Sequence, residues 1–129
     1  MLQLHRSPHE AYRRIDFDAQ IAGANPVQLV VLCYEQLGSA LGTAIHAQQA
    51  GDSARKSAAL ARALSAIAAL TMGLDRNQAI STAIVTMLES ARQTVLGSVL
   101  RFDEKALSDL KTDVLDIANA FQAAAASNR

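Results

Sequence analysis

The hydrophobic and polar residues of this 129-residue chain alternate with a helical period in four stretches. The clearest stretch covers residues 25–50 and opens with Asn25 and Pro26, a favoured N-cap residue followed by the residue best tolerated at the first helical position. On a helical wheel its polar side chains form one narrow strip, and more than half of the circumference is apolar or small. Because a surface helix shows a narrower apolar stripe, this helix is predicted to have neighbours on at least two sides.

Three further amphipathic helices are predicted downstream. Gly51 and Asp52 mark the first break, as a C′ glycine and the next N-cap, and a helix to about residue 74 follows. A third helix is expected over residues 78–100, and Asp103 is the expected cap of a fourth. The expected core positions lie three and four apart: Leu60, Leu64, Ile67, Leu70 and Leu74 in the second helix; Ile80, Ile84, Met87 or Leu88, Ala91, Val95 and Val99 in the third; Leu107, Leu110, Val114, Ile117 and Phe121 in the fourth.

Four helices joined by short turns must run antiparallel to their neighbours. The expected fold is therefore an all-α, antiparallel up-down four-helix bundle over residues 25–126. Residues 1–24 differ, because they mix charges of both signs and show poor periodicity, and they predict a short, flexible N-terminal strap. Tyr12 and Ile15, three residues apart, are the expected anchors of this strap on the bundle.

Composition narrows the class of protein. The formal net charge is zero, which argues against a nucleic-acid partner, because phosphate binders normally show a basic stripe. Aromatic residues make up 4% of a chain that is 50% hydrophobic and rich in alanine, which favours closely packed helices over a sheet. One cysteine fits a reducing compartment, and no apolar run is long enough for a membrane span or a secretory signal. A soluble cytoplasmic protein is predicted.

Catalytic, metal and cofactor signatures are not found in the sequence, and the chain is not expected to be an enzyme. His5 and His9 are four apart, but they lie in the predicted strap and are interpreted as surface residues. Cys33 lies among apolar neighbours, which indicates an inert buried thiol. His46 could act in a histidine phosphotransfer domain, but Gln49 and Ala50 stand where such domains would carry lysine and glycine.

The start of the first helix carries a recognisable signature. It consists of a small or polar residue, Pro, two variable positions, Leu, several apolar residues, and Tyr followed by an acidic residue, here Asn25, Pro26, Leu29, Val30, Leu32, Tyr34 and Glu35. An alanine-containing, Leu-rich second helix ends in a Leu-Asp turn, in the run ALARALSAIAALTMGLDRN over residues 59–77. With these features and Tyr12 in its lead, the chain resembles the flagellar secretion chaperones called FliS over about residues 12–126.

This resemblance implies a chaperone that binds the disordered C-terminal segment of flagellin, prevents early polymerisation and delivers it to the flagellar export apparatus. A bundle whose helices carry more apolar surface than its own core needs can offer grooves to such a tail. Most of the apolar side chains are nevertheless expected to be structural, and the strap is a candidate lid over a groove. The expected partner-binding residues are Tyr12, Ile15, Pro26, Leu29, Tyr34, Leu60, Leu64, Ile67, Leu74, Ile84 and Leu88. The alternative is a helical adaptor or dimerisation module, and the oligomeric state stays open.

Overall fold

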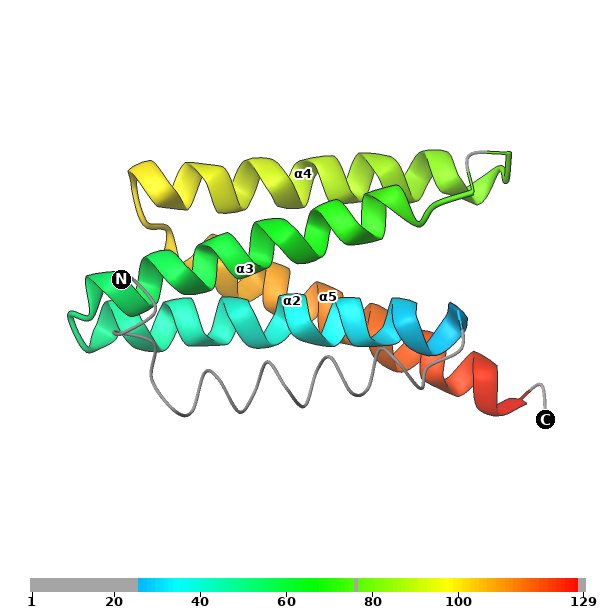
Figure 1. Ribbon diagram of the computed structural model, residues 1–129, viewed down its shortest axis with the longest axis horizontal. Helices are drawn as coiled ribbons and strands as arrows, with labels where there is room; N and C mark the ends of the chain where they lie inside the picture. The colour runs from blue at the N-terminus through cyan, green and yellow to red at the C-terminus, as the bar shows by residue number, and fades with distance from the viewer. Residues whose placement is uncertain (1–25, 76, 128–129) are drawn as a thin grey trace, which may run out of the picture.

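A computed structural model describes residues 26–75 and 77–127, and these residues form four helices and no strand (Figure 1). Helix α2 spans Pro26–Gln49, α3 spans Ser53–Met72, α4 spans Ile80–Leu100 and α5 spans Glu104–Ser127. Short connections make successive helices antiparallel, so the predicted all-α up-down four-helix bundle is confirmed. The proposed cap Asn25 and the predicted strap over residues 1–24 lie outside the described residues.

The turns form where the capping residues predict them. Gly51 has a φ of 70°, in the left-handed region that glycine adopts readily, and it ends α2. The Asp52 side chain accepts a hydrogen bond of 3.0 Å from the backbone N–H of Arg55 and so caps α3. Asp103 caps α5 in the same way, because its carboxylate accepts the backbone N–H of Ala106 at 3.0 Å.

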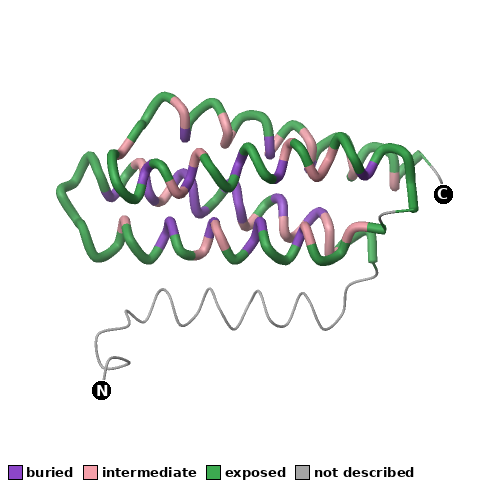
Figure 2. Tube along the Cα trace, turned by 90° about the horizontal axis from the view of Figure 1, so that it is seen from above, coloured by how far each residue is buried: buried purple, intermediate pink, exposed green. Residues whose placement is uncertain are grey.

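Helix α2 is the central element of the bundle. It packs extensively against both α3 and α5, as the breadth of its apolar surface predicts. Leu37, Ala40, Leu41 and Ala44 are completely shielded from solvent, and the buried positions of the helices face inward (Figure 2). The small residues let the helix axes approach closely, which explains how a chain with few aromatic residues still forms a dry core.

Two glycines of α2 set its distance from α5. A Cβ atom on Gly38 would lie 2.6 Å from Cδ2 of Leu115, and one on Gly42 would lie 3.1 Å from Nζ of Lys111. Both glycines are buried. Gly42 belongs to the polar strip of the wheel, yet it lies against α5 because it has no side chain to hold the two helices apart.

Helix α4 lies at the edge of the bundle. It packs mainly against α3 and only sparsely against α5, and Figure 1 shows it along one side, with α3 between it and α2. Ile80 is 65% and Val99 57% exposed. The expectation that both belong to the core stripe was wrong, because the neighbouring helices do not cover the two ends of α4.

Candidate functional site

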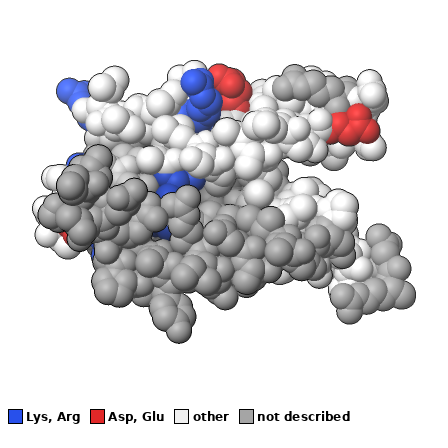
Figure 3. Space-filling model, in the orientation of Figure 1, with Lys and Arg blue, Asp and Glu red and all other residues white. Residues whose placement is uncertain are grey.

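One end of the bundle has an incompletely covered apolar interior. Six half-buried side chains from the described helices and the α3–α4 turn pack against the core there, and we call this set the apolar end. The surface is indented at this end, between the α3–α4 turn and the end of α5 (Figure 3). The apolar end consists of Val30 and Cys33 of α2, Leu74 after α3, Ile84 of α4, and Ile117 and Phe121 of α5.

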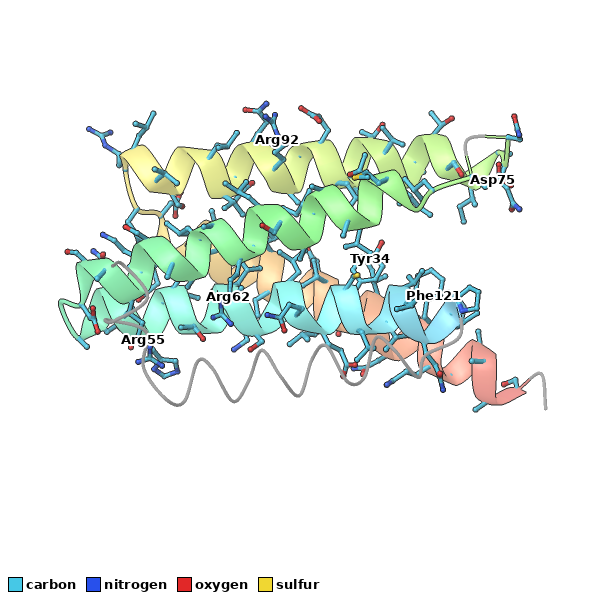
Figure 4. The ribbon with its side chains drawn as sticks, viewed as in Figure 1. Tyr34, Arg55, Arg62, Asp75, Arg92 and Phe121 are labelled. Atoms are coloured by element: carbon cyan, nitrogen blue, oxygen red, sulfur yellow. The ribbon has the colours of Figure 1, made fainter. Side chains whose placement is uncertain are left out.

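An aromatic pair lies beneath the apolar end. The rings of Tyr34 and Phe121 stack with their centroids 5.9 Å apart and an interplanar angle of 20°. Both lie toward the end of the molecule that carries Asp75, and Arg55 lies at the opposite end (Figure 4). Tyr34 is buried and Phe121 is half-buried, so the pair joins α2 to the last turns of α5 and forms the boundary between core and surface.

The described residues of the predicted partner-binding set fall into three groups by burial. Tyr34, Leu60, Ile67 and Leu88 are buried in the core, and Leu29, Leu64, Leu74 and Ile84 are half-buried, whereas Pro26 is exposed. Tyr12 and Ile15 lie outside the described residues. Leu74 and Ile84 belong to the apolar end, whereas Leu60 lies in the N-terminal half of α3, toward the opposite end. The buried members act in packing in this conformation, and a contact with a partner stays a prediction for the whole set.

Exposed apolar residues that the sequence reasoning did not select lie at the ends of α3 and α4. Met72 is 85% and Leu100 92% exposed, and Ile80 and Val99 are largely exposed as well. Met72 and Ile80 flank the α3–α4 turn and extend the apolar end outward. The sequence offered one signal for these exposed residues. Each lies near the end of a helix, where the apolar stripe continues beyond the helix that covers it.

Polar contacts tie the helices together at the opposite end. The Lys56 ammonium of α3 donates to Oε1 of Gln48 at 2.8 Å and lies 5.5 Å from the ring centroid of Phe102. The Gln49 amide donates to Oε1 of Glu104 at 2.9 Å. We call these five residues the clamp. Each contact is worth about 0.5–1.5 kcal/mol, and together they join α2, α3 and the α4–α5 connection.

A separate open hollow of about 500 Å³ lies between α2 and α5, lined by Gly38, Gly42, His46, Lys111 and Leu115 among others. His46 is exposed on its rim. Gly38 and Gly42, which allow the close contact between α2 and α5, also line the hollow. The absence of side chains at these two positions therefore contributes to its shape.

Burial changes the acidity of two neighbouring side chains of α2. It raises the pKa of the Cys33 thiol and that of the Tyr34 hydroxyl, because the charged forms lose hydration. The thiol is therefore neutral and unreactive at neutral pH, as the sequence predicts. The structure corrects one point, because Cys33 is half-buried at the apolar end and not fully enclosed.

Stability is expected to fall as the pH rises above the ordinary cysteine pKa of about 8.5. A group whose pKa is raised in the folded state contributes its full stabilisation at pH values below its unfolded-state pKa. This stabilisation is lost as the pH rises through its folded-state pKa. Urea unfolding of the protein and of Cys33→Ala at pH 7.5 and 9.5 (chosen to bracket this pKa of about 8.5) checks this. The wild type should lose more stability between the two pH values, and equal losses would contradict the assignment to Cys33.

The described residues contain no group of three His, Cys, Asp or Glu side chains placed to hold a metal ion. None of the helices described in residues 26–127 is long and apolar enough to cross a bilayer. The surface that stands out chemically is thus the apolar end.

Comparison with known protein families identifies the kind of protein that presents this surface. The sequence matches the family described as flagellar protein FliS over residues 8–128. The chain belongs to the FliS family. No curated protein matches the sequence.

Membership gives the bundle a general role. FliS proteins are flagellar export chaperones, a class of binding proteins and not an enzyme family, so the apolar end is interpreted as a surface for a polypeptide client. The family assignment also favours this reading over the phosphotransfer alternative, in which His46 would be the reactive residue.

Proposed function

We propose that this FliS protein binds the disordered C-terminal segment of flagellin in the bacterial cytoplasm. By covering that segment it keeps flagellin from polymerising early, and it delivers flagellin to the flagellar type III export apparatus. The observation that carries the proposal is the apolar end, where α2, α4, α5 and the α3–α4 turn leave apolar side chains half-covered against the core.

The physical reason lies in the chemistry of a tail that folds on binding. An amphipathic segment loses conformational entropy when it becomes a helix, and it needs a broad apolar footprint of about 1,000–3,000 Å² in compensation. Met72 and Ile80, both strongly exposed, enlarge the apolar end toward such a footprint. Apolar side chains elsewhere on α2 and α3 are also half-buried, among them Leu29 and Leu64. They are available to a tail that wraps around the bundle.

Co-purification tests the proposal directly. Tagged protein should retain flagellin from a lysate, and it should lose flagellin when the C-terminal segment of flagellin is removed. Failure to retain full-length flagellin would overturn the proposal and favour a helical adaptor or dimerisation module with another helical client.

A matched pair of substitutions on α4 locates the binding surface. Ile80→Asp should weaken flagellin binding about tenfold or more, because it places a charge among apolar contacts. Thr82→Asp adds the same charge at an exposed position two residues away and should leave the dissociation constant nearly unchanged. Calorimetry with a peptide of the flagellin C-terminal segment measures both. Equal effects of the two substitutions would exclude the apolar end as the site.

Residues 1–20 are proposed to cover part of this surface until the client arrives, with Tyr12 and Ile15 as the contacting side chains. Both residues carry large apolar surface in a segment that mixes charges of both signs, and that pattern is the support for the proposal. Deletion of residues 1–20 should then change the dissociation constant for flagellin, because the client would no longer compete with the strap. An unchanged constant would refute the lid.

A further inference from the structure

Helix α4 carries apolar side chains on a second side, away from the face that it buries in the bundle. The centre of its buried face is formed by Leu88, Ala91 and Val95. Val85 and Leu96 are half-buried. At 100° per residue these two side chains lie within about 20° of each other and roughly 100° away from the centre of the buried face. They therefore form a separate stripe along α4.

Two charged residues lie between Val85 and Leu96 on the same side of the helix. Glu89 and Arg92 form an ion pair of 3.7 Å, and their side chains are 61% and 52% exposed. Arg92 projects from the edge of α4 that points away from α3 (Figure 4). We call Val85, Glu89, Arg92 and Leu96 the outer flank. The largely exposed Val99 adjoins it toward the C-terminus of α4.

The outer flank is symmetric in sequence about its centre. Its four residues are separated by steps of four, three and four positions. When a second copy of α4 lies antiparallel and centred on the same point, Val85 lies level with Leu96 of the second copy. Glu89 lies level with Arg92 of the second copy in the same arrangement. A two-fold interface requires this kind of self-complementarity, because each copy contributes the same surface.

The charges favour the antiparallel orientation over the parallel one. In a parallel pair each Glu89 would lie beside the other Glu89, and each Arg92 beside the other Arg92, which is repulsive. In the antiparallel pair both ion pairs form between the two copies. The ion pair within the free chain is exposed, and exposed pairs contribute little to stability. Exchange of its partners for those of the second copy therefore costs little.

We propose that the outer flank is a homodimer interface, at which α4 packs antiparallel against α4 of a second copy about a two-fold axis between Ser90 and Ala91. Specific interfaces bury about 1,200–2,000 Å² in total, and one flank of one helix provides less. The dimer is therefore weak, with a dissociation constant on the order of 10⁻⁴ M. The two apolar ends lie at opposite ends of this dimer, because α4 begins at the apolar end and the paired helices run in opposite directions.

Sedimentation equilibrium of the 129-residue chain without any client tests the dimer. Between protein concentrations of about 10 μM and 1 mM, which bracket the expected dissociation constant, the weight-average mass should rise from the 13.7 kDa of one chain toward twice that value. A mass that stays at one chain over this range overturns the proposal. The measurement involves no flagellin, so its outcome is independent of the proposed function.

Val85→Asp and Ser90→Asp form a matched pair that locates the interface. Each adds one carboxylate to α4, but Ser90 is exposed about 130° around the helix from the outer flank. Val85→Asp should raise the dimer dissociation constant about tenfold or more, because the two-fold axis places two new charges in the apolar contact. Ser90→Asp should leave it nearly unchanged. Equal effects would assign the dimer to another surface and overturn the proposal.

Charge reversal tests the antiparallel register. Glu89→Arg and Arg92→Glu each place like charges opposite one another and should weaken the dimer about fivefold or more. The double variant Glu89→Arg, Arg92→Glu restores opposite charges across the axis, so its dissociation constant should return close to that of the wild type. Circular dichroism checks that the variants keep their helix content. The register is wrong, and the proposal with it, if the single variants dimerise like the wild type or if the double variant is as weak as they are.

Discussion

Leu37→Ala should destabilise the bundle by about 2–5 kcal/mol, a large part of the stability of a small domain. Leu37 is completely buried on α2, in contact with the core that α3 and α5 complete. Truncation removes its transfer free energy and leaves a cavity that the surrounding alanines cannot fill. Thermal unfolding followed by circular dichroism should show a drop in Tm of about 10 °C.

Leu100→Ala is the matched control. The side chain of Leu100 is 92% exposed at the end of α4, so the same substitution should change the free energy of unfolding by less than about 0.5 kcal/mol. A similar loss of stability in both variants would show that the burial pattern of the two leucines is wrong.

Gly38→Leu should force α2 away from α5, with an expected loss of about 1–3 kcal/mol from overpacking. The reason is the 2.6 Å separation between a Cβ atom at this position and Cδ2 of Leu115. Denaturant unfolding of the single variant measures the loss.

Truncation of the opposing side chain supplies the rescue. In the double variant Gly38→Leu, Leu115→Ala the new side chain occupies the space that Leu115 leaves, and part of the lost stability returns. A double-mutant cycle gives the coupling energy. Coupling close to zero would mean that the two side chains do not meet, and the account of the contact between α2 and α5 would fail.

Helix limits could be predicted from the sequence because local chemistry sets them. Gly51, Asp52 and Asp103 supply a left-handed turn and two side-chain caps, each within a few residues of the backbone group that it serves. The central role of α2 was also predictable, because its apolar surface is too broad for a single neighbour. These features depend on interactions close in sequence or on the width of one stripe.

The edge position of α4 was not predictable in the same way. Its apolar period continues from Ile80 to Val99, and a periodic stripe gives no information about the length of the surface that covers it. The clamp escaped prediction for a related reason, since Lys56 and Phe102 meet only after α3 and the α4–α5 connection have been placed.

The candidate site was predicted in part. Leu74 and Ile84 were selected from their stripes and do lie at the apolar end. Leu88 was selected from its stripe and is buried, because period alone does not distinguish the centre of a stripe from its margin, and Tyr34, selected from the family signature, is buried as well. Residues at the margins, such as Met72, were missed for the same reason.

The charged residues of α4 affect the rate at which a partner is expected to associate with this side of the protein. These residues are Glu89 and Arg92, and they neutralise each other across 3.7 Å on the surface. A partner approaching this side meets no long-range attraction, so we expect unsteered association at about 10⁵–10⁶ M⁻¹s⁻¹ that hardly changes with ionic strength.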